Sequence, residues 1–129
     1  MKIIDRLREE KIHISFEVFP PKNQDGFEKV LTATNKIAEL HPAFISVTYG
    51  AGGGTSKNTA KIASHIKRDL GVESIAHLTC VSSTKEEVRE VIANLKKLDI
   101  ENILALRRGY SCGNAVPVGR TVYTMPMSL

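Results

Sequence analysis

The feature that most constrains this chain is a regular exchange between two hydrophobic periods. Stretches that alternate or run apolar like strands are followed by stretches whose apolar residues recur every three or four positions, as in helices. The expected strands are 12–19, 44–49, 74–81 and 102–106. The expected helices are 3–10, a run that starts from Asp25 and is ended by His41 and Pro42, 57–70, and a helix behind residues 84–87 that reaches Leu98. Right-handed strand–helix–strand connections make such an order a parallel sheet. The sequence therefore predicts an α/β fold, either part of an eight-stranded barrel or a small doubly wound sheet.

Local signals support these boundaries. Pro20 and Pro21 stop the first strand, and Gly71 suits the left-handed residue that often follows a helix. Thr84 and Glu87 have the spacing of a capping box, which favours the start of a helix directly after Thr84. Residues 108–129 show neither period, so we expect an irregular tail after the fourth strand.

Composition excludes several classes of function. The 129 residues suit one domain at most, and the formal charge of +4 comes from Lys and Arg scattered among acids. Without a basic stripe and interleaved aromatic residues we expect no nucleic-acid partner, whereas the charge suits anionic small molecules. Cys80 and Cys112 form neither a disulfide framework nor a metal spacing, so no metal is expected. Residues 1–11 do not read as a signal peptide and no apolar run is long enough for a membrane span, so we expect a cytoplasmic protein without membrane contact.

Polar residues stand where the predicted strands end, which is where parallel α/β folds place their chemistry. Glu17 is the most informative, because it lies between Phe16 and Val18 in a segment that otherwise resembles core. Apolar surroundings raise the pKa of a carboxyl group and equip it as a general acid near neutral pH. The residues alone leave a second interpretation equally open, in which Glu17 alternates outward to a salt bridge under a helix.

At three other strand ends the residues allow both a functional and a purely structural interpretation. The glycine-rich loop 50–56 could bind phosphate, but it matches neither the P-loop nor the dinucleotide spacing, and a plain strand-to-helix turn explains it as well. His77 could be an acid–base group, a ligand donor or a satisfied core histidine. Arg107 could clamp a pyrophosphate or carboxylate, or simply end its strand in solvent.

Taken together, four of these segments resemble the bacterial type of methylenetetrahydrofolate reductase, in order and spacing, from residue 1 to about residue 107. The matching segments are Ser15–Lys22, Phe44–Ala51, His77–Cys80 and Asn102–Arg107. The resemblance implies a partial (β/α)8 TIM barrel, formed by about the first four β/α units over residues 1–107. It also implies FAD as cofactor, NAD(P)H as electron donor and reduction of 5,10-methylenetetrahydrofolate to 5-methyltetrahydrofolate, in one-carbon and methionine metabolism.

The same resemblance implies roles for single residues. Glu17 is similar to the catalytic acid that assists opening of the folate ring to an iminium. Tyr49, Ala51, His77 and Arg107 are similar to FAD contacts, and Thr48 is similar to a contact on the nicotinamide side. A homo-oligomer in the full-length form also agrees with the family.

The sequence departs from the family directly after Arg107. The family continues with Gly-Asp-x-Pro, whose aspartate lies against the flavin and the folate, whereas this chain continues with Arg108-Gly109-Tyr110-Ser111. DNA that encodes residues 108–115 can spell Gly-Asp-Ile-Pro-Ala-Gly-Met in its next reading frame. We therefore expect a frameshift, genuine or a sequencing error, and an inactive fragment. The alternatives are a non-catalytic truncated product and a phosphate-ligand-binding α/β domain.

Resequencing the gene around codon 107 tests this hypothesis. A sequencing error predicts a reading that continues with Gly-Asp after Arg107. An unambiguous Arg-Arg-Gly-Tyr reading would rule that version out.

Overall fold

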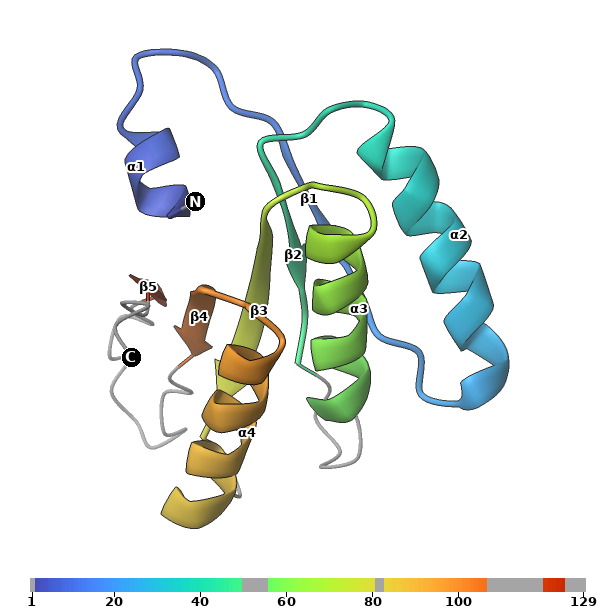
Figure 1. Cartoon of the computed structure of the whole chain (residues 1–129), viewed down its shortest axis with the longest axis vertical. Helices are drawn as coiled ribbons and strands as arrows, with labels where there is room; N and C mark the ends of the chain where they lie inside the picture. The colour runs from blue at the N-terminus through green and yellow to red at the C-terminus, as the bar shows by residue number, and fades with distance from the viewer. Residues whose placement is uncertain (1, 50–55, 81–82, 107–119, 125–129) are drawn as a thin grey trace, which may run out of the picture.

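The computed structural model describes residues 2–49, 56–80, 83–106 and 120–124, with only the backbone given for residues 24, 56 and 120–124. The strands are β1 (Ser15–Val18), β2 (Phe44–Val47), β3 (Ser74–Thr79), β4 (Asn102–Leu106) and β5 (Arg120–Thr124). The helices are α1 (Ile3–Leu7), the 3-10 turn η1 (Gln24–Gly26), α2 (Phe27–Ala38), α3 (Ser56–Arg68) and α4 (Lys85–Lys97). Figure 1 shows their arrangement.

The strand order resolves the choice between a barrel and a doubly wound sheet. The first four strands are parallel and lie in chain order, β1-β2-β3-β4, without the reversal that defines a doubly wound sheet. Figure 1 shows α2, α3 and α4 gathered together, with α1 apart from them. β1 and β2 begin level, with Ser15 opposite Phe44, whereas β3 and β4 each begin one residue later than the strand before, since Ile45 pairs with Ser74 and Ile75 with Asn102. This stagger is the shear that closes a β/α barrel.

The predicted elements are confirmed with shorter ends. The strand expected over 12–19 is limited to Ser15–Val18, because only these residues pair with β2; Ile12 is 91% exposed. The helix expected over 3–10 ends at Leu7. Gly71 has φ +66°, as its position after α3 predicts. The capping box is complete, with the Thr84 side chain and the Glu87 side chain each accepting a backbone N–H.

β5 corrects the expectation of an irregular tail. Residues Arg120–Thr124 form a strand that pairs antiparallel with β4 along its whole length, from Asn102 opposite Thr124 to Leu106 opposite Arg120. Backbone pairing needs no hydrophobic period, since an edge strand offers free N–H and C=O groups to any extended segment. The edge of β4 away from β3 is therefore paired with β5.

The core lies between one face of the sheet and the helices. Alternate residues of β1 to β4 point to this face, among them Val18, Val47 and Ile103. They pack against Ala60, Ile62, Ala63 and Ile66 of α3, against Leu95 of α4 and against Ile100, which follows α4. The amphipathic helices can bury their apolar stripes only on this side, so the opposite face of the sheet is left for other side chains.

A cluster of charges joins the N-terminal ends of two strands to α3. Lys67, only 14% exposed, places its Nζ 3.7 Å from a carboxylate oxygen of Glu73 and 3.5 Å from one of Glu101. Asn102 donates from Nδ2 to Glu73 (3.4 Å) and accepts the backbone N–H of Ile3 at Oδ1 (3.0 Å). The cluster therefore ties α1, α3, β3 and β4 together at the end of the barrel that conventionally provides stability.

Replacing Lys67 with methionine tests this role. Lys67→Met keeps the side-chain length but leaves two partly buried carboxylates without their shared cation, so we expect a loss of about 1–3 kcal/mol in the free energy of unfolding. Urea denaturation measures the loss. The matched control is Lys96→Met on the exposed side of α4, expected to stay within about 0.5 kcal/mol of the parent. Equal stability of the two variants would contradict the assignment.

Candidate functional site

Two of the predicted site residues, Glu17 and His77, meet on the face of the sheet that the helices leave free. Glu17 belongs to β1 and His77 to β3, with β2 between them. The Nε2 atom of His77 lies 3.7 Å from Oε2 of Glu17. The His77 side chain is 8% exposed and that of Glu17 is 46% exposed. The structure thus joins a half-exposed carboxylate to a buried imidazole.

The register of the sheet explains this meeting. Glu17 pairs with Ser46, and Ser46 pairs with Ile75, so these three side chains project from the same face. His77 is two residues beyond Ile75 and shares that face, one step nearer the C-terminal end of the sheet. Sixty positions of sequence separate the two residues, and only the parallel pairing of three strands closes that gap.

The surroundings of Glu17 differ from both interpretations that the sequence leaves open. Phe16 and Val18 flank Glu17 in the chain, but in a strand they point to the opposite face, and Val18 belongs to the core under the helices. The apolar enclosure expected from these two neighbours is therefore wrong. The ion pair under a helix is also wrong, because the observed partner of Glu17 is His77 on the other face.

Thr48 and Tyr49 follow β2 and diverge. The Thr48 backbone N–H donates to the carbonyl of Val18 (3.0 Å), and the Thr59 hydroxyl of α3 donates to the carbonyl of Thr48 (2.9 Å). Thr48 lies just beyond β2, where continued alternation directs its side chain to the face of Ser46. Tyr49 packs against the core on the side of the helices. The structure therefore holds Thr48 through its backbone at the end of β2 and places Tyr49 on the side away from Glu17 and His77.

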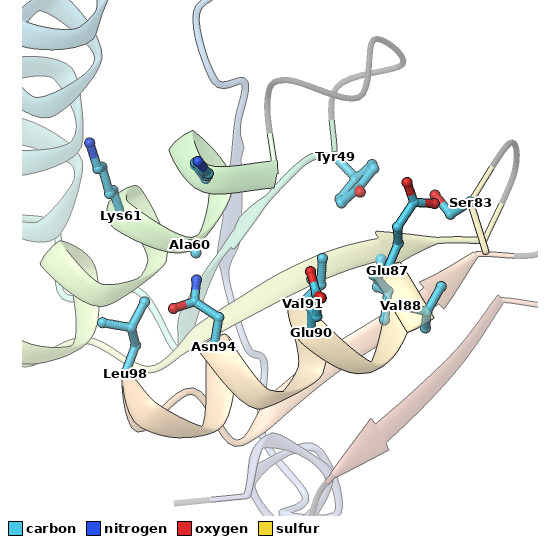
Figure 2. Close-up of a pocket in the computed structure, with 12 residues that line it drawn as sticks. Tyr49, Ala60, Lys61, Ser83, Glu87, Val88, Glu90, Val91, Asn94 and Leu98 are labelled. Carbon is cyan, nitrogen blue, oxygen red and sulfur yellow. The ribbon is translucent and has the colours of Figure 1, made fainter. Parts of the chain in front are cut away.

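Tyr49 lines a cavity of about 620 Å³ between α3 and α4. Figure 2 shows its ring at one end of this cavity, with Leu98 at the other end. The rim carries Lys57 and Lys61 from α3, and Glu87 and Glu90 from α4. Its size suits a small ligand. The cavity nevertheless lies on the helical side of the sheet, away from the Glu17–His77 pair, and it lacks the acid–base arrangement found there.

Two predicted cofactor residues, Ala51 and Arg107, lie outside the described residues, as does most of the glycine-rich loop 50–56. Among the residues that are described, no group of three or more His, Cys, Asp or Glu side chains could hold a metal ion. Within the same part of the chain no helix is long and apolar enough to cross a membrane. Cys80 is a free, exposed thiol.

The sequence-based interpretation missed Ser46. It lies between Glu17 and Ile75 across the sheet, is 8% exposed, and its hydroxyl donates to the carbonyl of Phe16 (3.4 Å). A polar residue inside the apolar run 44–47 was a usable indication, because it marks the face that does not contact the helices.

Comparison with known proteins decides the family. The family model described as methylenetetrahydrofolate reductase matches residues 2–121, which is most of the chain. This chain belongs to the methylenetetrahydrofolate reductase family. The match continues past Arg107, where the resemblance visible in the sequence ends. Membership identifies the four parallel strands and their helices as part of the family's TIM barrel.

Several curated members of the methylenetetrahydrofolate reductase family are similar to this chain. The 5,10-methylenetetrahydrofolate reductase of Buchnera aphidicola is 40% identical over 98 residues, which cover 76% of this chain and 34% of the relative. That of Pectobacterium carotovorum is 38% identical over 97 residues, covering 75% and 33%. Methylenetetrahydrofolate reductase (NADH) 1 of Arabidopsis thaliana is 34% identical over 111 residues, covering 83% and 19%. The chain thus spans about a fifth to a third of the relatives' length.

The hydrogen bond from Thr59 to the end of β2 yields a prediction. Thr59 is 2% exposed, so Thr59→Val leaves the Thr48 carbonyl without this donor in a buried place. We expect a loss of about 1–2 kcal/mol in the free energy of unfolding. Thr32→Val is the matched control, because the exposed Thr32 hydroxyl donates only within α2, to the Glu28 carbonyl at 2.9 Å. Thermal or urea unfolding that ranks the control as the more damaging variant would refute the prediction.

Proposed function

We propose that this chain forms the acid-bearing part of a methylenetetrahydrofolate reductase, an NAD(P)H-dependent oxidoreductase that converts 5,10-methylenetetrahydrofolate to 5-methyltetrahydrofolate. The observation that carries the proposal is the Glu17–His77 pair on the sheet face opposite the helices. In β/α barrels that face is the barrel interior, and its C-terminal end is the active-site mouth. Family membership supplies the reaction class, and the names of the relatives supply the folate substrate.

Glu17 fits the work of a general acid in this reaction. The five-membered ring of the substrate opens when the bond between the methylene carbon and one nitrogen breaks, and that nitrogen must take up a proton. A carboxylic acid in the barrel mouth delivers this proton and stabilises the cationic iminium as its carboxylate. Glu17 is 46% exposed, so the side chain is accessible to a ligand while its backbone is held by β1.

The proposed cofactor is FAD, reduced by NAD(P)H. When bound, the flavin supplies the hydride that turns the iminium carbon into a methyl group. The His77 imidazole offers a hydrogen bond next to Glu17, and the Thr48 hydroxyl follows at the end of β2, so both suit the polar edge of the flavin. By the family resemblance, Tyr49, Ala51 and Arg107 contribute further flavin contacts and Thr48 a nicotinamide-side contact. A cytoplasmic location, a role in methionine biosynthesis and a homo-oligomeric full-length form belong to the same proposal.

Because the chain spans about a fifth to a third of its relatives, the remaining walls of the flavin and folate sites belong to the rest of a complete barrel. We therefore expect this polypeptide alone to bind FAD weakly or not at all and to reduce no folate. The absorbance spectrum of the purified protein after incubation with FAD and gel filtration checks this expectation. A stoichiometric yellow complex would contradict it.

A chimera tests the reductase function itself. Residues 1–106 would replace the matching segment of the Pectobacterium carotovorum relative, and folate reduction and NADH oxidation with menadione as acceptor would both be measured. We expect both activities in the parent chimera. Glu17→Gln should lower folate reduction about 10²- to 10⁴-fold, because the acid is lost, and should leave the menadione activity unchanged, because flavin reduction needs no proton from Glu17.

The matched control is Glu28→Gln, which removes an exposed carboxylate on α2. It should leave both activities unchanged. A folded chimera that is inactive with menadione would refute the flavoprotein assignment. Full folate reduction by the Glu17→Gln chimera would refute the role of Glu17.

A further inference from the structure

The contact between His77 and Glu17 carries an inference beyond either residue's separate role. His77 is almost completely buried, yet its Nε2 faces a carboxylate oxygen 3.7 Å away. That separation is too long for a hydrogen bond but within the range of an ion pair when His77 is protonated. A small rotation of the half-exposed Glu17 side chain is enough to close the remaining gap.

A carboxylate and an imidazole at this separation are close enough to share one proton once the Glu17 side chain turns toward Nε2.

The elements around the pair contribute mainly uncharged groups. β2 presents Ser46, with Thr48 following it, and β3 itself presents Thr79. β4 places Leu104 directly opposite His77. In α1, the guanidinium of Arg6 donates to the carbonyl of Ala43 before β2 begins (2.6 Å). Arg107 and the side chains of β5 lie outside what the structure describes. Among the described side chains of β1 to β4, Glu17 is a charged group with an observed contact to His77.

We propose that Glu17 and His77 act as one acid–base unit, in which His77 is a positioning residue that holds and restores the proton delivered by Glu17. Glu17 passes its proton to the departing nitrogen of the folate ring and becomes a carboxylate. His77, neutral while Glu17 is the acid, then takes up one proton from solvent and passes a proton from Nε2 to that carboxylate, which restores the acid form of Glu17 and the neutral form of His77. This inference rests on the proposed function for its substrate, but the coupling of the two groups can be measured without any ligand.

The test is an NMR titration of the imidazole protons in the chain as it is, with His77→Gln used to assign the His77 resonance. In Glu17→Gln the midpoint of the His77 titration should fall by about 0.5–1 pH unit, because the carboxylate that favours the cation has been neutralised. In His77→Gln the carboxyl carbon of Glu17, followed by ¹³C NMR, should titrate at higher pH than in the parent.

The internal control is the second His–carboxylate pair. His65 Nδ1 lies 2.7 Å from Oδ2 of Asp69 on α3. Asp69→Asn should therefore move the His65 midpoint and leave that of His77 in place. The proposal is overturned if Glu17→Gln leaves the His77 midpoint within about 0.2 pH unit of the parent while Asp69→Asn shifts His65.

The acid–base unit and the reductase function can be refuted independently. Coupled titration together with a chimera that lacks flavin activity would keep the acid–base unit and remove the reductase function. Independent titration together with an active chimera that still needs Glu17 would keep the reductase function and remove His77 from the proton path.

Discussion

The packing of one sheet face against α2, α3 and α4 determines the rest of this structure. Val47, Ile62 and Ile66 are fully buried in that contact, and each apolar side chain of this size contributes about 1.5–3 kcal/mol by leaving water. Because side chains of a strand alternate, burying one set of residues under the helices forces the other set to the opposite face. Glu17 and His77 belong to that other set. The core therefore positions the chemistry, although it contains none of the groups that perform it.

The residues that stabilise the sheet and the residues proposed for the chemistry lie at different ends of the strands. The Lys67–Glu73–Glu101 cluster and the bond between Asn102 and Ile3 hold the N-terminal ends of β3 and β4. The Glu17–His77 pair lies further along the sheet, toward the mouth. This separation is the usual division of work in β/α barrels, where loops and strand ends at the mouth can vary without disturbing the base. It also explains why a half-exposed carboxylate can remain on a strand whose neighbours are core residues.

Much of the fold could be predicted from the sequence, because its elements follow from local periods. The helix over Phe27–Ala38, the capping box at Thr84 and the strand over Asn102–Leu106 appear where the pattern indicates them. The errors arise where backbone pairing between strands, and not the hydrophobic period, determines whether a segment forms a strand. Ile12 looks like strand but has no partner in β2, and Arg120–Thr124 has no strand period but pairs with β4. For the site, the structure brings the predicted residues Glu17 and His77 within 3.7 Å of each other, whereas the surroundings of Glu17 inferred from Phe16 and Val18 were wrong.

By itself, the sequence determined the order of strands and helices, the location of polar residues at strand ends and the family to which those segments belong. Each of these is a local property, readable from residues within a few positions of one another. Only the tertiary structure decided that the strands lie in chain order with the staggered register of a barrel, and that the partner of Glu17 is His77 and not a group beneath a helix. Those facts depend on hydrogen bonds between segments about 30 residues apart, and no local period records which strand pairs with which.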